Sequence, residues 1–221
     1  MPISKHNTQA HAAYQQIKQR ILAGSLTGQD RLREVEVAEL LGIGRTPVRE
    51  SLKRLEEEGL LTHEPRRGLV VTSLGQQAVA ELYAMREVLE GAAAGFAARH
   101  ATSAEIANME AILDEYGPTC DPVALNLEFH EAIYRAAHNR HLIRSLQSIT
   151  DTTYLLGRST LASRERADIA HLEHHDILKA IKAGDADRAG EAARDHIRKA
   201  LLERLKLLRQ RQREAETTEK V

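Results

Sequence analysis

Two arginines in the first third of the chain have the spacing of a nucleic-acid contact. Arg45 and Arg49 are four residues apart, so a helix places them on one face near its start. Thr46 and Pro47 favour that start, because proline suits the first helical turn. A helix N-terminus attracts phosphate, and arginine grips phosphates or guanine edges through paired hydrogen bonds. The sequence therefore predicts DNA contacts through Arg45, Thr46, Pro47 and Arg49.

A second basic group lies in a predicted turn downstream. Arg66 and Arg67 precede Gly68 there, and two strand-like segments at 60–62 and 69–72 bracket the turn at 63–68. Two cations on a flexible tip suit a groove beside the one that a helix enters. A lone arginine pair is more often a solvated helix surface. Here the helix start, the proline, the arginine spacing and the turn coincide, which favours DNA.

Histidines form the other set of candidates, since the chain has 11 of them. His130 follows Asn126 by four residues, so both share a helix face with apolar residues such as Ile133. His174 shares a helical stripe with Leu178. Both faces are therefore expected to point into a core.

His196 reaches the level of His174 by the arithmetic of a helical hairpin. If the chain reverses at Gly184, His174 lies ten residues before the turn and His196 about eleven after it. At about 1.5 Å per residue, both lie roughly 15 Å from the bend. Three inward histidines beside the Asn126 carboxamide predict a divalent-metal site. An inward histidine is more often a hydrogen-bonded core residue, so a metal-free histidine cluster is the alternative.

The elements that position the basic residues follow from hydrophobic periodicity and its breaks. A first helix is expected at 8–23 with Thr8 as its cap, a second at 34–41 and a third at 46–58. With the two strands, this order predicts a winged helix-turn-helix domain at 8–73.

The second half shows only helical periodicity. About six helices are expected, at 76–100, 103–116, 122–138, 140–157, 162–183 and 185–212. Thr102 and Glu105 have the spacing of a capping box, and Asp185 is an expected N-cap. The predicted fold class is mainly α, with an all-α bundle at 74–212 after the winged domain. The polar residues 213–221 are expected to form a flexible tail.

Composition narrows the class of protein. Hydrophobic residues make up 42% of the chain and charged residues 29%, while aromatic residues are only 3%, which favours a helical globular fold. The single Cys120, the lack of a long apolar run and the lack of a signal-peptide pattern predict a cytoplasmic protein with no membrane partner. The net charge of −1 is low for a DNA-binding protein, but residues 1–72 hold 11 Lys/Arg against 9 Asp/Glu.

Three segments of the first domain carry a family resemblance. Residues 42–52 (GIGRTPVRESL) resemble the recognition-helix signature of the GntR family of bacterial transcription regulators. Residues 55–61 (LEEEGLL) and the wing at 65–68 (PRRG) extend the resemblance over nearly all of 10–72.

This resemblance implies a homodimer that binds a short palindromic operator in double-stranded DNA. The contacts that it implies come from Arg45, Thr46, Arg49 and Gly68. Where some members carry another DNA-contacting arginine, this chain has Val35, and Arg33 is the candidate substitute for that phosphate contact.

The second half resembles the FCD effector domain of the FadR subfamily, in its six-helix, VanR-like branch. The residues that carry this resemblance are Phe129, His130, Glu173, His174, Ile177, Ala180, Ile181, Gly184, Asp185 and His196. Many members bind Zn²⁺ or Ni²⁺ through one aspartate and three histidines. The resemblance therefore implies a divalent metal, Zn²⁺ in the first place and Ni²⁺ in the second, held by Asn126, His130, His174 and His196. Asn126 stands where those members have the aspartate.

A small carboxylate effector is expected beside this site. Arg86 is the candidate clamp, because arginine holds a carboxylate through two hydrogen bonds, although Glu90 four residues later equally allows a plain salt bridge. Tyr134 and Arg158 are further candidates for the pocket wall. Family members commonly release DNA when the effector binds, so a repressor is expected, with a coupling free energy of about 1–3 kcal/mol.

A metal-dependent hydrolase of the HD type is the competing class. His175 and Asp176 are adjacent, with His130 upstream and Asp195 downstream, which supplies similar ligands. A hydrolase leaves the winged domain unexplained and needs His175, rather than His174, on the inward stripe. No enzyme activity is therefore expected.

Overall fold

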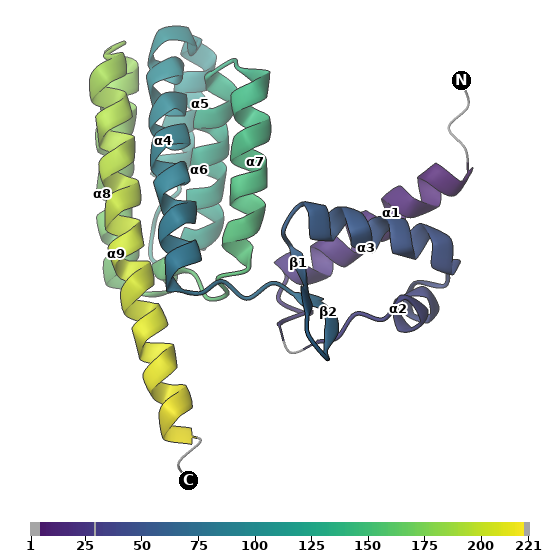
Figure 1. Ribbon diagram of the computed structural model, residues 1–221. Helices are drawn as coiled ribbons and strands as arrows, with labels where there is room; N and C mark the ends of the chain where they lie inside the picture. Colours follow the sequence, from purple (N-terminus) through teal and green to yellow (C-terminus); the bar gives the residue numbers. More distant parts are fainter. Residues whose placement is uncertain (1–4, 29, 219–221) are drawn as a thin grey trace. The chain divides into compact units, whose positions relative to one another are not determined.

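The computed structural model describes residues 5–28 and 30–218. Residue contacts divide the chain into two compact units, one up to Gly75 together with Thr150–Gly157, the other Gln76–Ile149 together with the residues from Arg158 on. Figure 1 shows a small helical unit with a two-stranded sheet, and a separate bundle of long helices. The mainly α fold class predicted from the sequence is confirmed.

The described part of the first unit contains three helices and two strands. They are α1 (Lys5–Leu22), α2 (Glu34–Leu41), α3 (Arg45–Glu57), β1 (Leu61–Glu64) and β2 (Gly68–Val71). The bounds of α2 are those predicted. Since α1 already includes Lys5, Thr8 lies inside the helix and its prediction as the N-cap is wrong.

The wing is a tight antiparallel hairpin. Leu61 pairs with Val71 and Glu64 with Gly68, so only residues 65–67 connect the strands and the predicted turn at 63–68 is too long. Gly68 has a φ of 82°, a left-handed conformation that suits the end of a three-residue hairpin loop. A prediction from hydrophobic residues alone misses the ends of these strands, because His63 and Glu64 next to the loop are polar.

Helix α3 is held on the body of the first unit by one face. Val48, Leu52 and Leu55 on this face are buried in the core that α1 also lines. The Ser51 hydroxyl donates a hydrogen bond of 2.7 Å to the Ala10 carbonyl of α1. The opposite face of α3 is left exposed.

The chain from Gln76 onward forms six α-helices within the described residues, as predicted. They are α4 (Gln76–His100), α5 (Ser103–Asp114), α6 (Pro122–Ala136), α7 (Arg140–Tyr154), α8 (Arg164–Lys182) and α9 (Ala186–Thr218), with a 3-10 turn at Thr160–Ala162. The predicted flexible tail at 213–221 is wrong as far as Thr218, because its Arg, Gln, Glu and Ala residues are good helix formers. Residues 219–221 lie outside the described residues.

Helices α4 and α9 lie side by side in the bundle (Figure 1). Small residues allow this close approach, since a Cβ added at Gly91 would lie 3.2 Å from the Gly190 carbonyl oxygen. The predicted capping box of Thr102 and Glu105 starts α5, and the Asp185 side chain caps the start of α9. None of the helices in the described ranges is long and apolar enough to cross a membrane.

Candidate functional site

The exposed face of α3 carries three of the predicted DNA contacts. Gly44 is the extended N-cap, and Arg45, Thr46 and Arg49 are exposed at the start of the helix. Pro47 is the third helical residue rather than the first, and it is buried. Its prediction as a DNA contact therefore does not fit the structure, and its role is to start the helix from within the core.

An acidic residue of α2 holds one of these arginines. The Arg49 guanidinium donates two hydrogen bonds of 2.8 Å to the carboxylate oxygens of Glu34, and this pairing lowers the pKa of Glu34. Arg45 also contributes to that lowering by its charge. Any anion that binds Arg49 must therefore compete with Glu34.

The position of the missing family arginine faces solvent. Val35 is 47% exposed, although it is apolar. Arg33, the predicted substitute, is also exposed and forms an ion pair of 2.6 Å with Glu36. Both residues are thus accessible at the start of α2.

Arg66 and Arg67, which the sequence predicts as a pair of DNA contacts, have different surroundings in the wing. Arg66 is exposed and has a φ of 69°, which is strained for a residue with a side chain. Arg67 bonds to Glu64 at 2.8 Å and to the Gly28 carbonyl at 2.9 Å, so it braces the hairpin. Gly68 lies against the Arg31 side chain, where a Cβ would come within 3.4 Å of Arg31 Nε.

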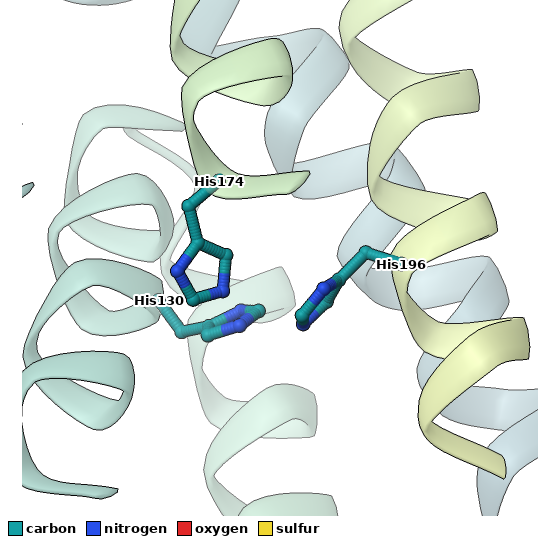
Figure 2. Close-up of side chains that lie close together, drawn as sticks. All are labelled: His130, His174 and His196. Atoms are coloured by element: carbon teal, nitrogen blue, oxygen red, sulfur yellow. The ribbon is translucent and has the colours of Figure 1, made fainter. Parts of the chain in front are cut away.

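Three histidines from three helices meet inside the second unit. His130 comes from α6, His174 from α8 and His196 from α9, and Figure 2 shows their rings facing one another. The ring centroids are 4.7–5.2 Å apart, and the exposed fractions are 6%, 4% and 3%. One potential ligand atom from each lies within 4.8 Å of the others. The hairpin arithmetic for His174 and His196 is confirmed.

Buried carboxylates lie beside the Nδ1 atoms of two of these rings. Glu90 Oε2 lies 2.7 Å from His130 Nδ1, and Glu173 Oε2 lies 2.7 Å from His196 Nδ1. A carboxylate at Nδ1 favours the tautomer with its proton there, so the lone pair is on Nε2. In the described structure, His130 Nε2 and His174 Nε2 are buried without a hydrogen-bond partner.

Burial keeps His174 and His196 neutral near pH 7. It lowers the pKa of His196 to about 4 and that of His174 well below its usual range, with the neighbouring imidazoles adding to both shifts. Arg86 and His130 hold the pKa of Glu90 low against the opposing effect of burial, and His196 does the same for Glu173. The site therefore has neutral imidazoles at His174 and His196, with ionised carboxylates around the cluster.

This arrangement fits a divalent transition-metal ion. Zinc in open sites takes three protein ligands and keeps a further position for water or a ligand, and ligating imidazoles commonly donate their other N–H to a carboxylate. His130, His174 and His196 supply the three nitrogens. Asn126, predicted as a fourth ligand, is half-buried and lines a small pocket together with His174. That pocket has a volume of about 20 Å³, room for one water-sized group.

The predicted effector residues fall into two places. Arg86 bonds to Glu90 at 2.8–2.9 Å, and Tyr134 lies within hydrogen-bonding reach of Glu90, so both belong to the network behind His130. The Arg158 side chain is exposed in the segment between α7 and α8, and its carbonyl accepts a hydrogen bond from Arg204. Arg158 is not brought to the histidines with the other two.

Sequence reasoning missed three residues around the histidines. The sequence points to Glu90 only as a salt-bridge partner of Arg86, and to Glu173 only as part of the family resemblance. Arg166 was not singled out, yet it is 7% exposed, bonds to Glu173 at 3.0 Å and leaves Nε and Nη1 without a partner among the described residues. A charged residue on an otherwise inward helix face was the available signal.

The residues needed for the hydrolase alternative are dispersed. His175 and Asp176 are exposed on α8, and Asp195 pairs with Arg198 on the surface of α9. Only His130 of that set lies in the buried cluster. The structure therefore does not assemble the HD-type ligands.

Two family models match the two units. The model described as bacterial regulatory proteins, gntR family, matches residues 9–71, and the FCD domain model matches residues 81–199. Together they cover both the exposed face of α3 and the three histidines.

Similar proteins match over most of their length. A transcriptional regulator of the HTH type from Bacillus subtilis is 31% identical over 191 residues, 83% of this chain and 84% of that protein. A probable D-xylose utilization operon transcriptional repressor of Paenarthrobacter nicotinovorans is 29% identical over 189 residues, 82% of each chain. The structure of E. coli McbR/YncC has a TM-score of 0.73 at 21% identity, covers 90% of this chain and 98% of that chain, and shows the same fold. The two relatives are named as transcription regulators, which confirms the expectation that the chain is not an enzyme.

Proposed function

Since this chain belongs to the GntR family of bacterial regulatory proteins and carries an FCD domain, we propose that it is a repressor whose DNA binding responds to a small carboxylate through a metal site. The chain is a DNA-binding transcription regulator. Repression, the metal, the effector and the homodimer are the proposed parts. The three-histidine cluster with its paired carboxylates is the observation that carries the metal and the effector.

We call the exposed start of α3, with Arg45, Thr46 and Arg49, the reading face. The proposed DNA contacts, there and on the wing, are residues whose side chains or backbone are accessible. Arg45, Thr46 and Arg49 would enter the major groove at the start of α3. Arg66 at the wing tip would reach the adjacent groove, Gly68 would allow the close approach of the backbone, and Arg33 would bind phosphate. Arg67 would contribute by fixing the hairpin.

A homodimer follows from the way in which such a unit reads DNA. One recognition helix covers only a half-site, and a palindromic operator matches a protein with two-fold symmetry. Met85 and Val88 on α4 are apolar and 48% and 60% exposed, so they are candidates for burial in the second unit's dimer contact. Charged substitutions of both, followed by light scattering, test this surface.

The proposed metal is Zn²⁺ or Ni²⁺, held by His130, His174 and His196, with Asn126 close enough to the pocket to complete the site. When bound, the ion supplies a Lewis acid that an effector carboxylate can ligate. Glu90 and Glu173 orient two of the imidazoles and balance the charge of the ion.

The effector must rearrange side chains as it enters, because the pocket beside His174 holds only about 20 Å³. Arg86 is engaged by Glu90, so an effector carboxylate would have to displace that partner. Among the described residues, Arg166 Nε and Nη1 have no hydrogen-bond partner, which makes Arg166 the better proposed clamp, with Tyr134 and Arg158 as weaker ones. Side-chain movement inside a packed bundle is a means of coupling the effector to DNA affinity.

The test uses protein purified without a histidine tag. Elemental analysis should find one tightly held ion per chain in the wild type and much less after His174→Ala, while the gel shift on the operator in metal-free buffer stays unchanged. A thermal-shift screen of mono- and dicarboxylic acids should then find stabilising acids only in the metal-loaded wild type. Equal metal content in wild type and His174→Ala would instead support the metal-free histidine core.

A further inference from the structure

A second pair of histidines lies on the outer face of α8, one and three residues from His174. His171 and His175 are four residues apart, and their Nε2 atoms are 3.1 Å from each other. The rings are nearly perpendicular, with centroids 4.5 Å apart. Neither residue belongs to the buried cluster of His130, His174 and His196.

This separation matches the bite of a two-histidine chelate. With metal–nitrogen bonds of about 2.0–2.1 Å, an angle of about 90–110° at the ion places the two nitrogens about 2.9–3.4 Å apart. The distance between the two nitrogens therefore fits one ion held by both. Without an ion, the same distance suits a hydrogen bond between two neutral imidazoles.

The surroundings fix one of the two rings in place. Tyr116 stacks on His171 with ring centroids 4.2 Å apart and an interplanar angle of 13°. The Tyr116 hydroxyl in turn donates to Asp168 at 2.7 Å. The charges of Asp168 and Asp114 favour a cation at His171, whereas Arg164, which bonds to Asp168 and lies over the Tyr116 ring, opposes it.

The same ring reaches the pocket beside the buried cluster. His171 and His174 both line the pocket of about 20 Å³, together with Tyr116 and Asn126. His171 is half-buried, His175 is exposed and His174 is 4% exposed. The three residues therefore form a path for an ion, from solvent at His175, past His171, to His174 in the interior.

We propose that His171 and His175 form an outer site for a divalent transition-metal ion, through which the ion enters the buried three-histidine site. The entry role rests on the proposed metal in the buried site. Metal binding by the outer pair does not rest on it. Water molecules complete the coordination of the ion at this exposed position, which keeps it weakly held and free to move inward.

The experiment uses full-length, untagged protein stripped with a chelator and titrated with Ni²⁺. The wild type should bind two ions per chain, His175→Ala one, and His174→Ala at least the outer one. His141→Ala, which removes another exposed histidine, is the matched control and should behave as the wild type. His175 is exposed, so its replacement leaves the fold intact.

The entry role is measured by the rate of Co²⁺ uptake, since cobalt in the buried site acquires the visible absorption of low-coordinate Co²⁺. At limiting Co²⁺, His175→Ala should slow uptake by about tenfold through the loss of a local ion store, while the final absorbance stays the same. The His141→Ala control should keep the wild-type rate.

The outcomes separate this proposal from the preceding one. If the wild type binds a single ion that disappears in His175→Ala and persists in His174→Ala, the buried site is wrong and the outer site stands without its entry role. Unchanged stoichiometry and an unchanged uptake rate in His175→Ala would overturn the outer site. An unchanged rate with one ion lost would overturn the entry role.

Discussion

At the scale of single residues, the buried histidines show how environment assigns a role. Each is an ordinary imidazole, but burial and close packing keep His174 and His196 neutral. Two carboxylates at the Nδ1 atoms leave the Nε2 atoms for another partner. Leaving such polar nitrogens buried and unpaired is costly, which is why an ion is the better explanation than a plain core.

The stability of the metal-free protein should fall as the pH is lowered from about 6.5 to 4. Burial lowers the pKa of His196 from its ordinary 6.5 to about 4. Between these pH values the His196 imidazole is protonated in the unfolded chain but not in the folded chain. The free energy of unfolding therefore decreases as the pH falls, by about 3 kcal/mol in the limit. The lowered pKa of Glu173 acts in the same direction, because its stabilisation is lost as the carboxylate is protonated.

Urea unfolding of chelator-treated protein at several pH values measures this effect. His196→Asn, which has no group titrating near neutral pH, should flatten the slope. Equal stability of the metal-free wild type at pH 7 and pH 5 would contradict the prediction.

The carboxylate behind His196 should tune the metal affinity. Glu173→Gln keeps the shape but removes the charge that holds the Nδ1 proton, so the affinity for Zn²⁺ should fall about 10–100-fold. Competition against a chromophoric chelator measures it. Glu191→Gln, the same change at an exposed position of α9, is the control and should leave the affinity unchanged. An equal loss in both variants would show a nonspecific charge effect.

At the scale of elements, the start of α3 and the start of α2 act as one surface. The proximity of Glu34 and Arg49 comes from the turn at Gly42, where a φ of 65° ends α2 and lets α3 cross it. The ion pair holds the Arg49 guanidinium against the Glu34 carboxylate. It also places a negative charge beside a proposed DNA contact.

Removing that charge should strengthen DNA binding. Glu34→Gln frees Arg49 for phosphate or guanine, so the affinity for the operator should rise severalfold, while Arg49→Gln should lower it and reduce the salt slope by about 1. Fluorescence anisotropy at several salt concentrations measures both. Glu57→Gln, at the far end of α3, is the control. Weaker binding by Glu34→Gln would mean that Glu34 positions Arg49 more than it repels DNA.

The contact of α4 with α9 should not tolerate a methyl group. In Gly91→Ala the new Cβ would lie 2.8 Å from Arg194 Cγ and 3.2 Å from the Gly190 carbonyl oxygen. We expect a loss of about 1–3 kcal/mol of stability, despite the better helix propensity of alanine. Thermal unfolding measures it, with Gly117→Ala, which meets nothing within 4 Å, as the control. A stabilised Gly91→Ala variant would show that the helices can separate without cost.

At the scale of the whole molecule, the chain is two units with separate cores. One core surrounds Leu55 in the winged unit, and the other surrounds Phe129 and Ile177 in the bundle. The reading face lies in the first unit and the three histidines in the second. Any influence of the metal site on DNA must therefore pass between units rather than act inside one core.

Calorimetry should resolve this division. Metal that binds the folded bundle should raise the midpoint of one unfolding transition, by mass action, and leave the other unchanged. A chelator should lower the same transition, and His174→Ala should abolish the response. A single transition that shifts as a whole would show that the two units unfold together.

Local sequence patterns determined the helices, the turns and the buried helix faces of this protein. The spacing of apolar residues predicts the nine α-helices of the described residues, though not the 3-10 turn. The type and order of residues 42–68 predict a helix start and a hairpin, because capping, helix periodicity and turn chemistry act between near neighbours. The apolar stripes predict the inward positions of His130 and His174, and the hairpin arithmetic predicts the level of His196.

Only the tertiary structure decided which distant groups meet. The pairing of Glu34 with Arg49, the carboxylates of Glu90 and Glu173 behind the histidines, and the stacking of Tyr116 on His171 join different parts of the chain. The burial of Pro47 and the bracing role of Arg67 likewise depend on packing. Periodicity shows which side of a helix is buried, but the partner on that side is set by the packing of whole elements.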